Sequence, residues 1–199
     1  MPAEPGGRRV RADAQRNIDA LIAAAAAVFA DSGVDAGVRE IAARAGVGMG
    51  TLYRHFPQRS DLVSAVFRQE VDACAEAASG LAADHEPVEA LARWLRRYTD
   101  FIATKQGLAA ALHSGDPAFD ALPRYFDARF RPALGALLES AAATGAIRAD
   151  VDANDLLRAV ANLCVTTRRD SADHAHRMVD LLVDGLRFGA GGDRGSEQR

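Results

Sequence analysis

The side chains best suited to chemistry gather in one short stretch, residues 49–56. Its hydroxyl, guanidinium and imidazole groups can all form hydrogen bonds with phosphates or with base edges. If the stretch is helical, Leu52 and Phe56 lie on its inward side. The outward side then carries Met49, Gly50, Thr51, Tyr53, Arg54 and His55. This pattern predicts an exposed surface that could contact nucleic acid.

A tight turn before this stretch connects it to another short helix. We expect helices over residues 38–44 and 49–56, separated by Ala45-Gly46-Val47-Gly48. Gly46 lets the chain reverse tightly, and Val47 can fill the space between the helices. The two helices therefore have the pattern of a helix-turn-helix. The second helix is short enough to present its N-terminal end to a major groove.

Several strings in this part of the chain occur together in a known order. They are Gly33, Val38-Arg39-Glu40-Ile41-Ala42, Ala45-Gly46-Val47 and Gly50-Thr51-Leu52-Tyr53-Arg54-His55-Phe56, followed by the basic Arg59. With these strings, residues 15–62 resemble the DNA-binding domain of the tetracycline-repressor (TetR) family of transcriptional regulators. A weaker likeness to the C-terminal half of some family members lies in residues 145–151.

The resemblance implies both a fold and a function. The fold is all-α, with nine helices: an N-terminal three-helix domain containing the helix-turn-helix, and a helical ligand-binding and dimerisation domain. The function is regulation of transcription, with repression as the family's default. The partners implied are double-stranded operator DNA, a second copy of the chain and an unidentified small organic ligand, without a membrane and without a cofactor.

The resemblance also implies roles for the residues that match the family motif. Arg39 would reach a guanine edge or a phosphate. Thr51 and Tyr53 would contact phosphates and thymine methyls, and His55 would grip a backbone phosphate. Arg59 stands in place of the lysine usual at the start of the fourth helix, and it would also contact phosphate.

Four positions depart from the family pattern or vary within it. Gly37 and Gly48 stand where a hydroxyl residue is common, so two helix caps or phosphate contacts are expected to be missing. Met49 stands where a polar base-reading residue is common, and Arg54 occupies the variable position and could read bases. The operator sequence therefore does not carry over from the family.

Each of these side chains also has a purely structural interpretation. Tyr53 could close the small core, and His55 could cap the end of its helix. Arg39 could be a solvated surface charge. The arginines at 8, 9 and 11 could be an idle tail or an arm that follows the phosphate backbone.

The bulk composition is consistent with a globular DNA-binding protein. Of the 199 residues, 49% are hydrophobic, which is ample for a core. The net charge of −3 is uneven: residues 1–60 carry 8 Arg against 6 acidic residues, net +2, and the remainder carries net −5. A local basic surface is sufficient for phosphate binding. We see no membrane span or signal peptide, and we expect a cytoplasmic protein. Cys74 and Cys164 could pair across a dimer, but in a cytoplasmic protein we expect two unpaired buried thiols.

Alanine-rich, helix-favouring sequence dominates the whole chain. We expect four parts: a disordered basic arm over 1–14, the helix-turn-helix domain over 15–58, the ligand-binding and dimerisation domain over 59–188, and a disordered tail over 189–199. The nine expected helices cover about 15–31, 38–44, 49–56, 59–83, a segment opened by Pro87, 106–112, 118–144, 153–168 and 172–188.

The short helix expected over residues 49–56 can contact only a few base pairs. Specific binding therefore needs two copies of it about 34–36 Å apart, and a two-fold dimer supplies them. The last two helices carry the apolar stripes expected to form that dimer, and the resemblance implies the same. The stripes consist of Leu157, Val160, Ala161 and Cys164 on one helix, and Met178, Leu181, Leu182 and Gly185 on the other. The alternative is that they only close the core of a single chain.

Aromatic residues cluster in the middle of the sequence and predict a pocket for a small organic ligand. The expected lining, with a few polar groups, is Trp94, Tyr98, Phe101, His113, Phe126, Phe130 and Asn162. The alternative is a plain packed core.

Two other classes of protein fit the sequence less well. An enzyme is disfavoured because we find no nucleophile elbow, phosphate-binding loop or metal-ligand set, so no catalytic or metal-binding residue is expected. His174 and His176 are two residues apart on a helix and face different ways. A helical adaptor that binds protein is the other alternative. Affinity for duplex DNA that falls steeply with salt would distinguish the regulator from both.

Overall fold

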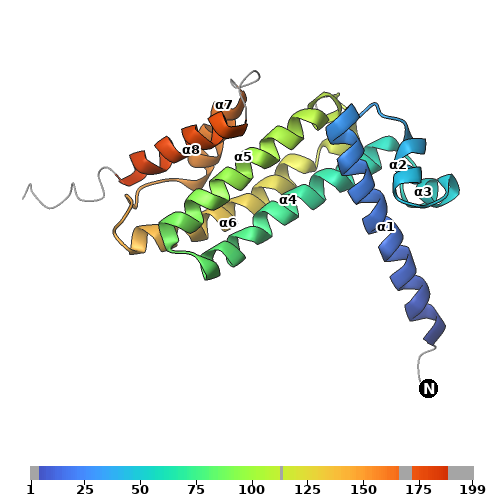
Figure 1. Ribbon diagram of the computed structural model, residues 1–199, viewed down its shortest axis with the longest axis horizontal. Coiled ribbons are helices and arrows are strands. Elements are labelled where there is room, and N and C mark those ends of the chain that lie inside the picture. Colours follow the sequence, from blue (N-terminus) through green and yellow to red (C-terminus); the bar gives the residue numbers. More distant parts are fainter. Residues whose placement is uncertain (1–4, 113, 166–171, 188–199) are drawn as a thin grey trace, which may run out of the picture. The chain divides into compact units, whose positions relative to one another are not determined.

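The computed structural model describes residues 5–112, 114–165 and 172–187, and these residues form eight α-helices, one 3-10 turn and no strand (Figure 1). In chain order the elements are α1 (Pro5–Ser32), α2 (Val38–Arg44), α3 (Met49–His55), α4 (Arg59–Asp84), α5 (Pro87–Leu112), the 3-10 turn η1 (Pro117–Phe119), α6 (Leu122–Ala143), α7 (Ala153–Val165) and α8 (Ala172–Arg187). The all-α fold expected from the sequence is confirmed. None of the described helices is long and apolar enough to cross a membrane.

The described residues form eight α-helices instead of the expected nine because two of the expected helices form one continuous helix. The helix opened by Pro87 continues to Leu112 without a break, so no separate helix begins at residue 106. Gly107 lies between Gln106 and Leu108, with alanines at 109–111, and a single glycine inside such a helix-favouring sequence costs about 1 kcal/mol, which weakens a helix without ending it.

The ends of two further helices also differ from expectation. The structure begins α1 at Pro5, ten residues before Gln15, within the stretch expected to be a disordered arm. Proline is well suited to a first helical position because its N–H is not needed there. The helix expected from residue 118 instead begins at Leu122, after the turn in which the Asp116 side chain accepts a hydrogen bond from the Ala118 N–H at 2.9 Å. The expected tail over 189–199 lies outside the described residues.

The chain divides into two compact units, and the domain boundary expected at residue 58 stays a prediction. Unit 1 contains Met1–Gln69 and Lys105–Leu122, and unit 2 contains Glu70–Thr104 and Pro123–Arg199. The first part of α4 and the last part of α5 therefore belong to the unit that holds the helix-turn-helix. The core of unit 1 is built on apolar side chains of α1 to α4 that are essentially inaccessible to solvent: Leu21, Val28, Ile41, Leu52 and Leu62.

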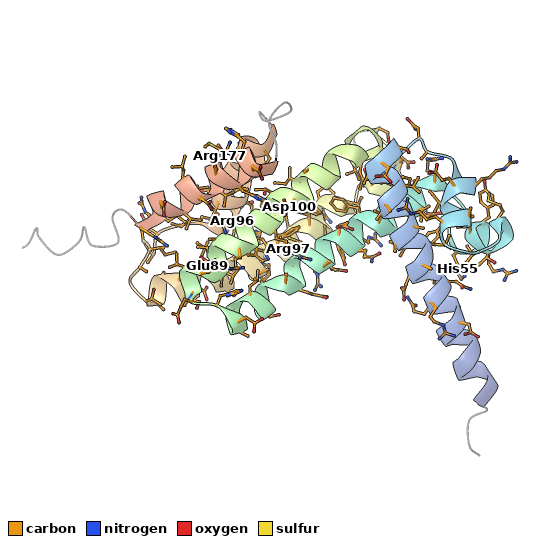
Figure 2. The ribbon with its side chains drawn as sticks, viewed as in Figure 1. His55, Glu89, Arg96, Arg97, Asp100 and Arg177 are labelled. Carbon is orange, nitrogen blue, oxygen red and sulfur yellow. The ribbon has the colours of Figure 1, made fainter. Side chains whose placement is uncertain are left out.

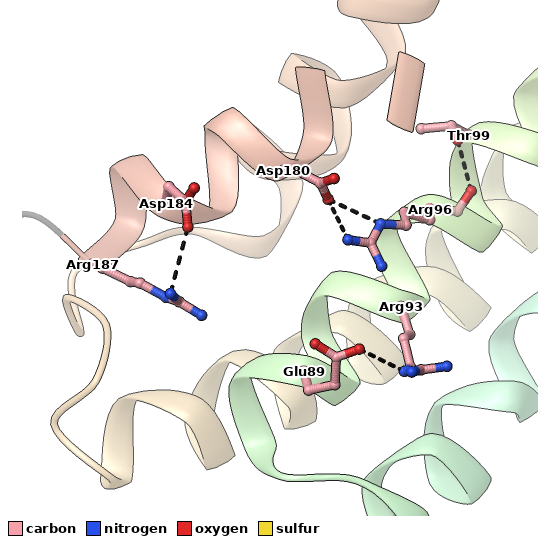
Figure 3. Close-up of polar contacts among 7 residues, drawn as sticks. All are labelled: Glu89, Arg93, Arg96, Thr99, Asp180, Asp184 and Arg187. Atoms are coloured by element: carbon pink, nitrogen blue, oxygen red, sulfur yellow. Dashed lines mark hydrogen bonds and ion pairs between the residues drawn. The ribbon is translucent and has the colours of Figure 1, made fainter. Parts of the chain in front are cut away.

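Unit 2 has its own core and its own polar contacts between helices. The core includes Leu91, Trp94, Leu95, Phe130, Leu134, Val160 and Val183. The buried Trp94 indole N–H donates to the Cys74 carbonyl at 2.9 Å, which joins α5 to α4. On the rim, Arg96 of α5 pairs with Asp180 of α8 at 2.6 Å (Figure 3). Such an exposed ion pair adds little energy, so the two helices are held together mainly by their buried apolar side chains.

Candidate nucleic-acid interface

The turn between α2 and α3 is closed by a pair of backbone hydrogen bonds. Gly46 has φ +68°, a left-handed conformation that glycine adopts without strain. The Gly46 N–H donates to the Ala43 carbonyl at 3.1 Å, and the Val47 N–H donates to the Ala42 carbonyl at 3.0 Å. This is the Schellman arrangement, which satisfies the last carbonyls of α2 and turns the chain sharply. The position of the turn glycine in the sequence therefore determines where α2 ends and α3 begins.

The helix α3 has one buried side and one accessible side. Leu52 is 1% exposed and Phe56, just after the helix, is buried, so both anchor α3 to the core. Tyr53 is 50% exposed, and Gly50 and Arg54 are exposed as well. The remaining residues of the predicted outward side are half-buried: Met49, Thr51 and His55, the last labelled in Figure 2.

The helix α2 carries a further exposed basic side chain. Arg39 is exposed in its first turn, whereas Arg44 lies 3.6 Å from the Asp31 carboxylate at the end of α1. The residues preceding α2 and α3 are Gly37 and Gly48, and neither helix start has a side-chain cap. The absence of both caps agrees with the expectation from the sequence. Both arginines of α2 are therefore exposed, and Arg44 is engaged in an ion pair with Asp31.

Arg59 occupies a different environment from the one expected. Its guanidinium donates to the Val34 carbonyl and, at 2.8 Å, to the Ala36 carbonyl. Both carbonyls belong to the loop between α1 and α2. Sequence reasoning expected only a phosphate contact at this position and missed the link to the loop, because the partners are backbone atoms more than twenty residues away and leave no signal in side-chain spacing.

The aromatic residues of the expected ligand pocket form a tightly packed cluster in unit 2. The Trp94 and Tyr98 rings stack with centroids 5.8 Å apart, and Phe130 contacts Trp94 at 5.6 Å and Phe126 at 4.4 Å. Phe101 stacks on Tyr98 at 6.2 Å. These distances are those of favourable aromatic pairs. The five rings therefore fill the space between α5 and α6 by contacting one another.

Three ionisable groups of unit 2 have raised pKa values because they are buried. Burial raises the pKa of the Tyr98 hydroxyl well above its usual value, and the same group donates a long hydrogen bond of 3.4 Å to the Leu157 carbonyl. Burial also raises the pKa of the Cys74 thiol to about 12 and raises that of Cys164. Both cysteines are free and buried, as expected. Desolvation, which disfavours the charged form, is the dominant cause in all three cases.

Of the two polar residues expected in the pocket, one is exposed and the other is not among the described residues. Asn162 is exposed on α7, and its expected place in a ligand pocket stays a prediction. The helix turns this amide outward because Val160 and Cys164, on the opposite side of α7, are buried. His113 lies outside the described residues.

The expected dimer stripes divide between the core and the surface. Leu157, Val160 and Cys164 of α7 are buried within the single chain. Their burial within one chain favours the alternative expected from the sequence, a role in the core, and their place in a dimer interface stays a prediction. On α8, Leu181 is 63% exposed and Gly185 is exposed, while Met178 and Leu182, like Ala161 of α7, are half-buried.

Residues on neighbouring helices of unit 2 form polar links that the sequence did not reveal. Asp72 of α4 accepts hydrogen bonds from the Tyr125 hydroxyl and the Arg129 Nε of α6, both at 2.6 Å. His176 of α8 lies 2.9 Å from the carboxylate of Asp100, which is labelled in Figure 2. The partners are more than fifty residues apart, so no local spacing could predict them.

Comparisons with known proteins agree with this geometry over both halves of the chain. Residues 21–66 match the family described as bacterial regulatory proteins, tetR family, and residues 86–188 match the transcriptional regulator SbtR-like, C-terminal domain. A TetR transcriptional regulator of Streptomyces coelicolor is 40% identical, with 85% of this chain and 98% of that chain covered and a TM-score of 0.74. A TetR transcription regulatory protein of Mycobacterium vanbaalenii is 37% identical, with 89% and 99% covered and a TM-score of 0.71.

A curated relative matches over a shorter stretch. An HTH-type transcriptional regulator of Staphylococcus aureus (strain USA300) is 39% identical over 64 residues, which are 32% of this chain and 35% of that protein. The match therefore spans about a third of the length of the curated relatives.

The fold and the exposed face of α3 define a helix-turn-helix, DNA-binding regulator of transcription. The chain belongs to the TetR family of bacterial transcriptional regulators. Proteins of this family and fold are regulators of transcription and not enzymes.

Proposed function

We propose that the chain is a homodimeric repressor that binds a palindromic operator and changes its affinity for that operator when a small organic molecule binds. The observation that carries the proposal is the half-exposed Tyr53 beside the exposed Arg54 on a helix anchored by the buried Leu52. Side chains held in this way can enter a major groove without any loss of core packing. Such a role requires the protein to act in the cytoplasm.

The proposed dimer follows from the size of the reading helix and from the surface of α8. With seven residues, α3 can contact only a few base pairs, so a specific site needs two copies about one helical turn apart. The exposed Leu181, flanked by the half-buried Met178 and Leu182, supports α8 as the surface that a second copy covers. A two-fold interface uses the same patch on both subunits, so one exposed leucine is presented twice.

The proposed ligand response uses the aromatic cluster of unit 2. Trp94, Tyr98 and Phe130 suit flat or apolar organic molecules, with the Tyr98 hydroxyl as a neutral donor. A ligand would have to displace rings that now contact one another, and it would therefore favour a different packing of unit 2. Only a difference in affinity between the two packings can couple the ligand to DNA.

The test begins with the selection of duplexes from the intergenic DNA beside the gene or from a random library. Affinity is then measured between 50 and 200 mM salt, where a protein with several phosphate contacts loses roughly a thousandfold or more. The selected site should be an inverted repeat, and light scattering should give the mass of two chains. Tyr53→Ala and Arg39→Ala should each weaken binding. Unchanged binding in both variants would remove these residues from the reading role, and a salt-independent or monomeric protein would overturn the proposal.

A further inference from the structure

The place of Arg59 in α4 is not explained by the stability of that helix. Arg59 is the first residue of α4, where the positive end of the helix dipole disfavours a cation. The helix start is already stabilised by Asp61, whose carboxylate accepts the Gln58 N–H at 2.9 Å. The guanidinium therefore has a function outside its own helix.

The partners of Arg59 are the carbonyls of the loop that leads into the helix-turn-helix. That loop starts at Gly33, in the left-handed conformation with φ +77°, and its turn is closed by the Ala36 N–H donating to the Gly33 carbonyl at 3.2 Å. The Gly37 carbonyl accepts the Glu40 N–H of α2 at 3.0 Å. These backbone bonds do not use the carbonyls of Val34 and Ala36, and the Arg59 guanidinium donates a hydrogen bond to each of them.

We propose that Arg59 is a positioning residue that ties the start of α4 to the α1–α2 loop and thereby holds the α2–α3 pair in its DNA-reading orientation. The inference rests on the proposed DNA-binding role of α3, and it replaces the direct phosphate contact expected for Arg59. A planar guanidinium has donors on two separate nitrogens and reaches both carbonyls at once. A lysine keeps the charge, but its single ammonium cannot reproduce this two-nitrogen geometry.

The substitutions Arg59→Lys and Arg59→Gln separate the two roles. If Arg59 positions the loop, both variants bind the selected duplex about tenfold more weakly, because two charge-assisted hydrogen bonds no longer form. They bind an unrelated duplex of the same length as the wild type does, and the dependence of affinity on salt keeps its slope. If Arg59 contacts phosphate, Arg59→Lys binds like the wild type. Arg59→Gln then weakens both duplexes and lowers the slope by about 0.9 for each phosphate that the protein no longer neutralises.

Two control variants calibrate these measurements. Arg54→Gln changes an exposed side chain of α3 that the proposed function places directly against DNA. Its loss of affinity is the reference for a direct DNA contact. Arg93→Gln removes an exposed arginine of unit 2 that pairs with Glu89 at 2.7 Å (Figure 3), and it should leave binding of both duplexes unchanged. Thermal melting of each variant shows that the binding data refer to folded protein.

Amide hydrogen exchange without DNA provides a second, independent measurement. Loss of the link should speed exchange in residues 34–56 of Arg59→Lys and leave α5 unchanged. Wild-type exchange rates together with wild-type affinity in Arg59→Lys would overturn the inference. A wild-type protein that binds no duplex would instead overturn the proposed function, and the exchange measurement would still test the link.

Discussion

Two large apolar side chains stand out on the described surface, one in each unit, and their neighbours differ. Tyr53 on α3 is 50% exposed, and Leu181 on α8 is 63% exposed. Around Tyr53, the helix Met49–His55 contains no acidic residue and ends in Arg54 and His55. Around Leu181, α8 carries both signs of charge, and two of its carboxylates are paired: Asp180 with Arg96 at 2.6 Å and Asp184 with Arg187 at 3.5 Å.

The difference shows that exposure alone does not identify the partner of a surface. A face without carboxylates can approach a polyanion, since no like charge opposes the phosphates. A face with paired charges around an apolar centre resembles a protein interface, with an apolar middle and a polar rim. Two exposed apolar side chains can thus have different partners, and their surroundings support the proposed nucleic-acid contact in unit 1 and the proposed second chain in unit 2.

The largest effect should come from the buried neighbour of Tyr53. Leu52→Ala should lower the free energy of unfolding by about 2–5 kcal/mol, because Leu52 is fully buried and its truncation leaves a cavity. Tyr53→Ala should change it by less than about 0.5 kcal/mol, because the ring is half in water. Urea denaturation followed by circular dichroism checks both values. Equal destabilisation by the two variants would remove the distinction between the two sides of α3.

The next largest effect should appear at α8. Leu181→Glu should weaken the proposed dimer about 100-fold or more, since a two-fold interface would bury two new unpaired charges. Sedimentation equilibrium measures the dissociation constant, and Leu181→Met, which keeps an apolar side chain, should remain dimeric. A dimer that tolerates the glutamate would mean that another surface joins the subunits.

A smaller effect should be confined to DNA binding. Tyr53→Ala should weaken binding of the selected duplex by about tenfold or somewhat more, as expected when one good interaction with a base or a phosphate is removed. Fluorescence anisotropy gives the affinity, and the dimer dissociation constant should stay at the wild-type value. Tyr53→Phe separates the hydroxyl from the ring, because a full loss of affinity in this variant assigns the interaction to the hydroxyl. A dimer weakened along with DNA binding would show that the two exposed faces are not independent.

The smallest effect should come from the ion pair beside α8. Asp180→Asn should lower the free energy of unfolding by less than about 1 kcal/mol, since both partners are more than a third exposed and solvent screens the pair. The difference from wild type should shrink further at 1 M salt, where screening is stronger. A loss of stability that is large and independent of salt would show that Asp180 contributes through packing and not through charge.

Local patterns predicted the helices α2 and α3 well and the contacts between distant chain segments poorly, for physical reasons. The helices α2 and α3 are short and bounded by glycines, so their limits and the inward side of α3 follow from nearby residues alone. An apolar stripe such as that of α7 has the same spacing whether it fills its own core or a dimer interface, and the core assignment of Val160 needed coordinates. The pair of Arg96 and Asp180 and the link from Arg59 to Ala36 depend on chain segments that only the fold brings together.

The turn glycine at position 46 limits how this part of the chain can change over evolution. A Cβ atom added to Gly46 would meet nothing within 4 Å, so space does not exclude a side chain there. The left-handed φ of +68° does disfavour one, because an L-residue in that conformation costs about 1–2 kcal/mol. Asparagine tolerates this conformation better than other residues do, whereas β-branched residues tolerate it badly. The chirality of L-amino acids therefore restricts the residue types that this position tolerates. A D-alanine placed there by peptide ligation would adopt the left-handed conformation as readily as glycine.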